Sequence, residues 1–263
     1  MSPIRAALAA LFLTLPFGMT GSINPPAPLY TAASIVNAAS YSAGSLAPNT
    51  IASIYGVNLS FSTEGLTAAD MTDGGLPTTL DGVTVYVCGY SAGLFYVSPL
   101  QINFLVPNVL IPGVCTLNMV RDGFAGPTVT ITLNLTGPGL FMDGSGNAIA
   151  QHLDGSLLTS AAPGAPGEWV VVYAVGLGRT VPDADLYAAS TVAAPITNIA
   201  EFSLTLNGAA VPPGAIYYAG TTPDCVGLYQ INLLIPQDAA PNPQIQISIG
   251  TAISAGQIQL PVS

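Results

Sequence analysis

Residues 94–107 read LFYVSPLQINFLVP, and residues 216–236 read IYYAGTTPDCVGLYQINLLIP, so the second stretch repeats the first around a longer loop. A second pair lies upstream of these. Residues 48–59 are PNTIASIYGVNL and residues 166–177 are PGEWVVVYAVGL, with Pro, Tyr and Leu at matching offsets. Two matches in the same order in two halves of a chain indicate a duplicated structural unit. We therefore predict two tandem domains of one fold.

Short alternating runs predict that each unit is built from β-strands. In residues 128–135 (TVTITLNL), apolar side chains alternate with Thr and Asn, as expected for a strand with one buried face. Similar runs recur along the chain, and turns rich in the 28 Gly and 23 Pro separate them. Many short strands at short spacing indicate an all-β sandwich or barrel.

The boundary between the units is expected near residues 135–146 (LTGPGLFMDGSG), where an alternating run ends in Gly-Pro-Gly. This predicts one β-sandwich domain at residues 46–137 and a second at residues 138–263. Residues 23–45 begin with the Pro-rich INPPAP, which disfavours a helix. We predict an extended N-terminal segment there, with its residues 35–36 pairing with a sheet edge.

Residues 1–22 have the layout of a secretory signal peptide. Arg5 precedes an apolar run at residues 7–16 (ALAALFLTLP), and small residues follow at Gly18, Thr20, Gly21 and Ser22. The run is too short to span a bilayer, and no later stretch is long and apolar enough to do so. We therefore expect no membrane insertion of the mature chain, and a secreted protein that is extracellular or on the cell surface.

Charged side chains are scarce and mostly negative. The chain has 13 acidic residues against three basic ones, while half of its residues are hydrophobic. So few cations cannot neutralise phosphates, which excludes nucleic acid as a partner. The same shortage disfavours binding to anionic membranes.

Cysteine usage fits an exported protein. Cys88 and Cys115 lie in or beside strand-like runs of the first half, and an oxidising compartment favours a disulfide between them. The alternative is a pair of buried thiols. Cys225 lies in the loop TTPDCVG, where it is either free or paired with another chain, and the free thiol is favoured.

Several long words of the sequence carry a resemblance to a known family. They are VNAASYSAGSLAPNTIASIYGVNL, LPTTLDGVTVYV, LFYVSPLQINFLVP, PGEWVVVYAVGLG and GLYQINLLIP, in this order from Val36 onward. The chain resembles the Solibacter-type uncharacterised C-terminal domain of exported acidobacterial proteins, which implies an exported β-protein and no particular reaction. IASIYGVNL and VVVYAVGL also resemble the first strand of IPT/TIG domains. That resemblance implies two tandem immunoglobulin-like β-sandwiches.

The residue inventory argues against catalysis. His152 is the sole histidine, and no Gly-x-Ser-x-Gly motif accompanies it. We interpret His152 as a solvated strand histidine. No cofactor motif is present, so the sequence predicts no enzyme and no cofactor.

A calcium site is the strongest of the weak metal candidates. Asp143, Ser145 and Asn147 have alternating oxygen side chains, and Asp154 follows across a predicted hairpin. An EF-type loop needs more carboxylates and a closing Glu. The favoured interpretation is therefore a Gly-rich turn and no metal site.

Aromatic side chains are the candidates for ligand contact. Tyr217 and Tyr218 are adjacent in a predicted strand, so they point to opposite faces and at most one is exposed. Trp169 lies in the apolar run EWVVVYAV, which predicts a core position. The repeated Gln-Ile-Asn at residues 101–103 and 230–232 recurs in both halves, which favours structural hydrogen bonds over a binding site.

Two hypotheses for function follow. The first is a non-catalytic extracellular or cell-surface module for structure or adhesion, whose partners are other surface proteins or itself. In a bolder form it self-assembles when residues 23–45 add as a strand to a neighbouring sheet. The alternative is a carbohydrate-binding module with an extracellular glycan as partner.

Overall fold

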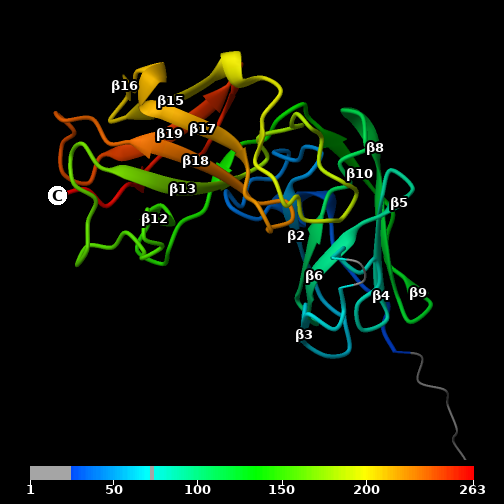
Figure 1. Ribbon diagram of the computed structural model, residues 1–263. Coiled ribbons are helices and arrows are strands. Elements are labelled where there is room, and N and C mark those ends of the chain that lie inside the picture. The colour runs from blue at the N-terminus through cyan, green and yellow to red at the C-terminus, as the bar shows by residue number, and fades with distance from the viewer. Residues whose placement is uncertain (1–24, 72–73) are drawn as a thin grey trace, which may run out of the picture.

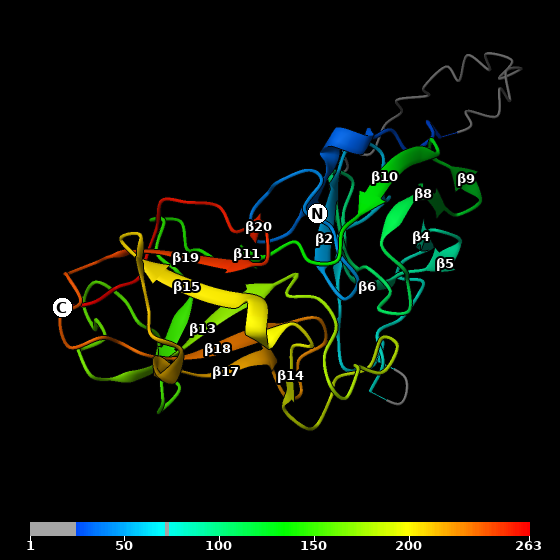
Figure 2. The ribbon, with the colours of Figure 1, turned by 90° about the horizontal axis from the view of Figure 1, so that it is seen from above.

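The structure is a computed structural model that describes residues 25–71 and 74–263 (Figure 1). It confirms an all-β fold of two immunoglobulin-like sandwiches that lie beside one another (Figures 1 and 2). The signal peptide predicted at residues 1–22 lies outside the described residues. Among the residues described, no helix is long and apolar enough to cross a membrane.

The first sandwich has two antiparallel sheets. One has the order β1-β2-β7-β6-β3, and the other has the order β10-β8-β4-β5, with β9 paired to β8. The elements are the 3₁₀ turn η1 (Ala32–Ser34) and the strands β1 (Ile35–Asn37), β2 (Ile51–Tyr55), β3 (Glu64–Gly65), β4 (Val83–Val87), β5 (Tyr90–Ser91), β6 (Gly93–Val97), β7 (Gln101–Leu105), β8 (Gly113–Arg121), β9 (Phe124–Ala125) and β10 (Val129–Leu133).

The second sandwich repeats this plan. One sheet has the order β11-β13-β18-β17-β14, with β12 paired to β13, and the other has the order β16-β15-β19-β20, with β21 paired to β19. The elements are β11 (Gly139–Leu140), β12 (Ala150–His152), β13 (Trp169–Val175), β14 (Ala194–Pro195), η2 (Ile199–Glu201), β15 (Phe202–Leu206), β16 (Ala209–Ala210), η3 (Pro213–Ala215), β17 (Ile216–Thr221), β18 (Tyr229–Leu234), β19 (Gln244–Ile249), β20 (Ala252–Ile253) and β21 (Ile258–Gln259).

The duplication predicted from the repeated words is confirmed by topology and register. Strands β2, β7 and β6 of the first sandwich correspond to β13, β18 and β17 of the second. The irregularity in pairing also recurs, because the register shifts between Leu94 and Tyr96 in β6 and between Ile216 and Tyr218 in β17. Ile51 pairs with Leu105 as Trp169 pairs with Leu234, so Ile51 and Trp169 are structural counterparts.

Each sandwich has its own hydrophobic core. The buried cluster of the first includes side chains from Tyr30 to Leu133, and that of the second includes side chains from Leu140 to Val262. Cys88 and Cys115 form a disulfide beside the first core, with their Cα atoms 5.2 Å apart, and Cys225 is an exposed free thiol.

The N-terminal segment belongs to the first sandwich and does not precede it as a separate extended piece. Strand β1 pairs with β2, as the sequence predicted for residues 35–36. The hydroxyl of the buried Tyr30 donates to the Pro127 carbonyl at 2.6 Å and accepts from the Met119 amide at 3.0 Å. The predicted pairing of residues 35–36 with a sheet edge is thus confirmed, and residues 25–45 also contain an aromatic core residue.

Arg121 is buried in the first sandwich and binds the N-terminal segment. Its guanidinium donates to the carbonyls of Pro26 at 2.9 Å and Asn58 at 2.5 Å. It also stacks on Phe61, with 3.8 Å between the guanidinium carbon and the ring centroid. The cation is therefore held by backbone oxygens and an aromatic ring.

Candidate functional site

The outer face of the β13–β18 sheet carries the polar and aromatic side chains of the second sandwich. On β13, Val170, Val172 and Ala174 point into the core and are fully buried. Since side chains alternate along a strand, Trp169 and its i+2 and i+4 neighbours point outward. The prediction that Trp169 is a core residue is thus wrong. Both faces of β13 carry apolar side chains, and the face that packs in the core is the one with Val170, Val172 and Ala174.

A β-bulge presents Tyr217 beside Trp169. The register shift between Ile216 and Tyr218 leaves Tyr217 without a partner on β18, and its side chain is 81% exposed. The rings of Trp169 and Tyr217 meet edge to face, with centroids 6.2 Å apart and planes at 79°. We call these two rings the aromatic pair.

Tyr218, the second aromatic candidate from the sequence, has a structural position. Its hydroxyl donates to the Thr221 carbonyl at 2.7 Å, and its ring covers Gly220, at which a Cβ would collide with the Tyr218 hydroxyl. Tyr217 is therefore the exposed member of the two adjacent tyrosines.

Two shallow hollows meet at the aromatic pair. One of about 410 Å³ is lined by Leu153, Trp169, Tyr217 and Asn232. The other, of about 470 Å³, is lined by His152, Leu153, Asp154, Ser156, Glu168 and Trp169. Because Trp169 and Leu153 line both, the hollows form one surface, which we call the Trp169 face.

His152 and Glu168 form an ion pair at one side of the Trp169 face. The imidazole Nδ1 lies 2.5 Å from the Glu168 carboxylate, and Nε2 lies 3.3 Å from the Ala162 carbonyl. The hydrogen bond to Glu168 raises the pKa of His152. Partial burial raises the pKa of Glu168, but hydrogen bonds from the Ala165 amide and from His152 outweigh it, so that the pKa of Glu168 is lowered.

The serine near His152 is not a nucleophile paired with a base. The Ser156 hydroxyl donates to Asp154 at 2.6 Å, and both His152 ring nitrogens point elsewhere, toward Glu168 and the Ala162 carbonyl. Nucleophilic catalysis requires a serine–histidine hydrogen bond. His152 and Ser156 are therefore not arranged as a base and its nucleophile.

The ion pair predicts a pH window for stability. Because the pKa of His152 is raised in the folded state, its protonated form stabilises the fold. This stabilisation is complete below the ordinary pKa of 6.5 and is lost as the pH rises through the raised pKa. Because the pKa of Glu168 is lowered in the folded state, its ionised form also stabilises the fold. This stabilisation is complete above the ordinary pKa of 4.5 and is lost as the pH falls through the lowered pKa. We expect the midpoint of urea unfolding to be highest between pH 4.5 and 6.5. In that range, His152→Gln is expected to lower the unfolding free energy by about 1 kcal/mol or less. An equal loss at pH 9 would contradict this role of the pair.

The calcium candidates cap their own turns. The Asp143 carboxylate accepts from the amides of Ser145 at 2.8 Å and Asn147 at 2.9 Å, and from the Asn147 side chain at 3.1 Å. Hydrogen bonds, led by that from the Asn147 amide, lower the pKa of Asp143. Asp154 likewise accepts from the Ser156 amide at 2.9 Å. In residues 25–71 and 74–263, no group of three His, Cys, Asp or Glu side chains is placed to hold a metal ion.

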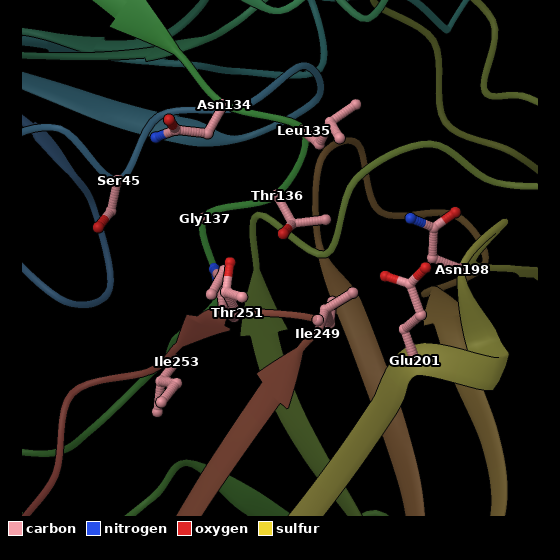
Figure 3. A pocket seen from close by; sticks show the side chains of 13 residues that line it. Ser45, Asn134, Leu135, Thr136, Gly137, Asn198, Glu201, Ile249, Thr251 and Ile253 are labelled. Atoms are coloured by element: carbon pink, nitrogen blue, oxygen red, sulfur yellow. The ribbon is translucent and has the colours of Figure 1, made fainter.

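A crevice of about 450 Å³ lies at the junction of the sandwiches (Figure 3). Ser45, Asn134 and Thr136 line it from the first, and Asn198, Glu201 and Thr251 line it from the second. Leu135, Ile249 and Ile253 add apolar surface to these polar groups, but the lining has no aromatic ring. The Trp169 face is the better candidate because it adds two aromatic rings to its apolar and polar groups.

The first sandwich has a counterpart of the Trp169 face, and the second sandwich packs on part of it. Ile51 replaces Trp169, and Phe95 replaces Tyr217 at the bulge. Gly227, in the long loop between β17 and β18, packs on this counterpart so closely that a Cβ there would lie 3.0 Å from Ile51. One copy of the surface is therefore an interface, and the other is open.

No protein-family model matches the chain, and no curated protein matches it. Among solved structures, it is similar to the surface glycan-binding protein PbSGBP-B from Prevotella bryantii, with a TM-score of 0.27 and 13% identity over 88% of this chain and 41% of that one. It is also similar to Bacteroides ovatus SGBP-B in complex with a mixed-linkage heptasaccharide, with a TM-score of 0.32 and 10% identity over 84% of this chain and 43% of that one.

Tandem Ig repeats of Dlar are similar as well, with a TM-score of 0.21 and 13% identity over 91% of this chain and 96% of that one. The chain spans less than half of the length of the two glycan-binding proteins.

Proposed function

We propose that this chain is a non-catalytic, extracellular carbohydrate-binding module, and that the Trp169 face is its binding site. The observation that supports this is the aromatic pair, an exposed Tyr217 in edge contact with Trp169, with polar groups on either side. An exposed aromatic surface of this kind marks a binding site more often than a packing site.

Sugars match this combination of groups. The C–H face of a pyranose ring is apolar and stacks on an indole or phenol ring, while the hydroxyls at its rim need hydrogen-bond partners. Asn232 lies on one side of Trp169, and Asp154 and Glu168 lie on the other. Their amide and carboxylate groups supply donors and acceptors for hydroxyls.

The self-assembling alternative has less support. Strand addition to another copy requires a segment that is not already paired in its own sheet. Residues 35–37, however, pair with β2 of their own sandwich. Arg121 and Tyr30 hold the preceding residues in place. The segment would have to leave its own core before it could join a neighbour.

Tryptophan fluorescence tests the proposal directly, because Trp169 is the sole tryptophan of the chain. We expect saturable quenching or a shifted emission maximum with soluble neutral oligosaccharides, and retardation in affinity gels that contain the matching polysaccharide. Absence of both effects across a glycan panel would contradict the proposal. Retardation with unchanged emission would place a sugar site elsewhere on the chain and refute the Trp169 face.

A further inference from the structure

The polar surface of the second sandwich continues from Trp169 along β13 and β18. Tyr173 lies on the same outer face as Trp169, opposite Gln230, and its hydroxyl donates to Gln151 at 2.7 Å. Gln230 in turn donates to Asn232 at 3.0 Å. These hydrogen bonds orient the side chains and leave the second amide atom of each without a hydrogen bond to any described residue.

The length of this surface exceeds one sugar ring. Tyr173 lies four residue steps after Trp169, which corresponds to about 13 Å along a strand. The hollow at the aromatic pair already extends toward Tyr173, because Asn232 lines it. Asn232 pairs with Val171, which lies midway between Trp169 and Tyr173 on β13. A ligand that stacks on the aromatic pair therefore meets further hydroxyl partners toward Tyr173.

The charge around the surface excludes an anionic ligand. Asp154 and Glu168 line it, and the one nearby group able to carry positive charge, His152, is committed to Glu168. In the described chain, Arg121 is buried in the first sandwich and Arg179 pairs with Asp183. A uronate or sulfate would meet carboxylates here without an arginine or lysine to pair with.

We infer that the ligand of the Trp169 face is a neutral glycan chain of several sugars that runs along β13, stacked on the aromatic pair and continuing to Tyr173. This inference rests on the proposed carbohydrate-binding function and specifies its substrate class. The hydrogen-bonded row Gln151–Tyr173 and Gln230–Asn232 is the part of the site that recognises the later sugars.

Calorimetry with cello-, xylo- and manno-oligosaccharides, from monosaccharide to hexasaccharide, tests the length of the site. We expect affinity to rise with chain length and then level off. In Tyr173→Ala we expect about tenfold weaker binding of the hexasaccharide, a loss of one good contact, with disaccharide affinity unchanged. Tyr55→Ala, at the equivalent position of the first sandwich, is the matched control and leaves both affinities unchanged.

Oligogalacturonates of the same lengths test the charge requirement, and we expect no measurable binding. Affinity that does not depend on chain length, or a Tyr173→Ala variant that binds the hexasaccharide normally, would refute the extended site while sugar binding itself stands. Equal binding of oligogalacturonates would refute neutrality. If the wild-type chain binds none of the probes, the proposed function fails and this inference fails with it.

Discussion

Replacement of Arg121 by alanine is expected to destabilise the first sandwich by about 3 kcal/mol or more. The substitution removes the charged donor from the carbonyls of Pro26 and Asn58. It also removes the cation stacked on Phe61 and opens a cavity beneath the N-terminal segment. The midpoint of urea unfolding, followed by far-ultraviolet circular dichroism, measures the loss.

Two further variants separate the causes. Burial of an arginine without a carboxylate partner costs desolvation free energy, and in some proteins an apolar residue of similar size is equally stable. Arg121→Met keeps most of the volume but no donor, so we expect it to lie between wild type and Arg121→Ala. Arg179→Ala is the surface control, since Arg179 is 56% exposed in its pair with Asp183, and we expect a loss of about 1 kcal/mol or less. Equal stability of Arg121→Met and wild type would show that the two carbonyls do not need the guanidinium.

The repeated sequence stretches predict the fold because they mark equivalent positions of two sheets with corresponding strand orders. Gln230 and Asn232 donate and accept within β18 as Gln101 and Asn103 do within β7, at 3.0 and 2.8 Å. We predicted structural hydrogen bonds to turns, whereas the structure shows bonds along the strand. The recurrence of the motif in both copies reflects this shared hydrogen bond, and in the second copy the same two side chains also belong to the proposed sugar site.

The site was harder to predict than the fold. Every residue of β13 is apolar or aromatic, so the alternation does not reveal which set faces inward. The neighbouring strand β18 shows which face of β13 is exposed. Its polar Gln230 and Asn232 face outward and pair with Tyr173 and Val171. The exposure of Tyr217 follows from a bulge, which a strand pattern of period two does not encode.

The two copies have diverged where they correspond most closely. In the second, the loop between β17 and β18 has lengthened, and its Gly227 covers Ile51 of the first. Nearby, the hydroxyl of the buried Tyr229 accepts from Asn49 at 3.0 Å and donates to the Gly178 carbonyl, which joins the sandwiches. In the first copy the equivalent connection is only the turn at residues 98–100. The Trp169 face of the second copy is open, as the two hollows on it show.

Trp169→Ala is therefore expected to weaken glycan binding by about 2 kcal/mol or more, roughly thirtyfold, because it removes the central ring of the site. Trp169 lies on the outer face of β13, so we expect the unfolding free energy to fall by only about 1 kcal/mol. Tyr217→Ala should weaken binding in the same direction and to a smaller extent. Calorimetry measures each loss, since the first variant has no tryptophan fluorescence.

The matched control is Phe95→Ala, at the bulge of the first sandwich that corresponds to Tyr217. If the aromatic pair is the binding surface, this variant binds glycan with unchanged affinity even where it lowers stability. A loss in Phe95→Ala equal to that in Tyr217→Ala would instead mean that binding depends on the fold as a whole. Unchanged affinity in a folded Trp169→Ala variant would contradict the assignment of the site, because no other exposed ring of the second sandwich is in contact with Tyr217 among the described residues.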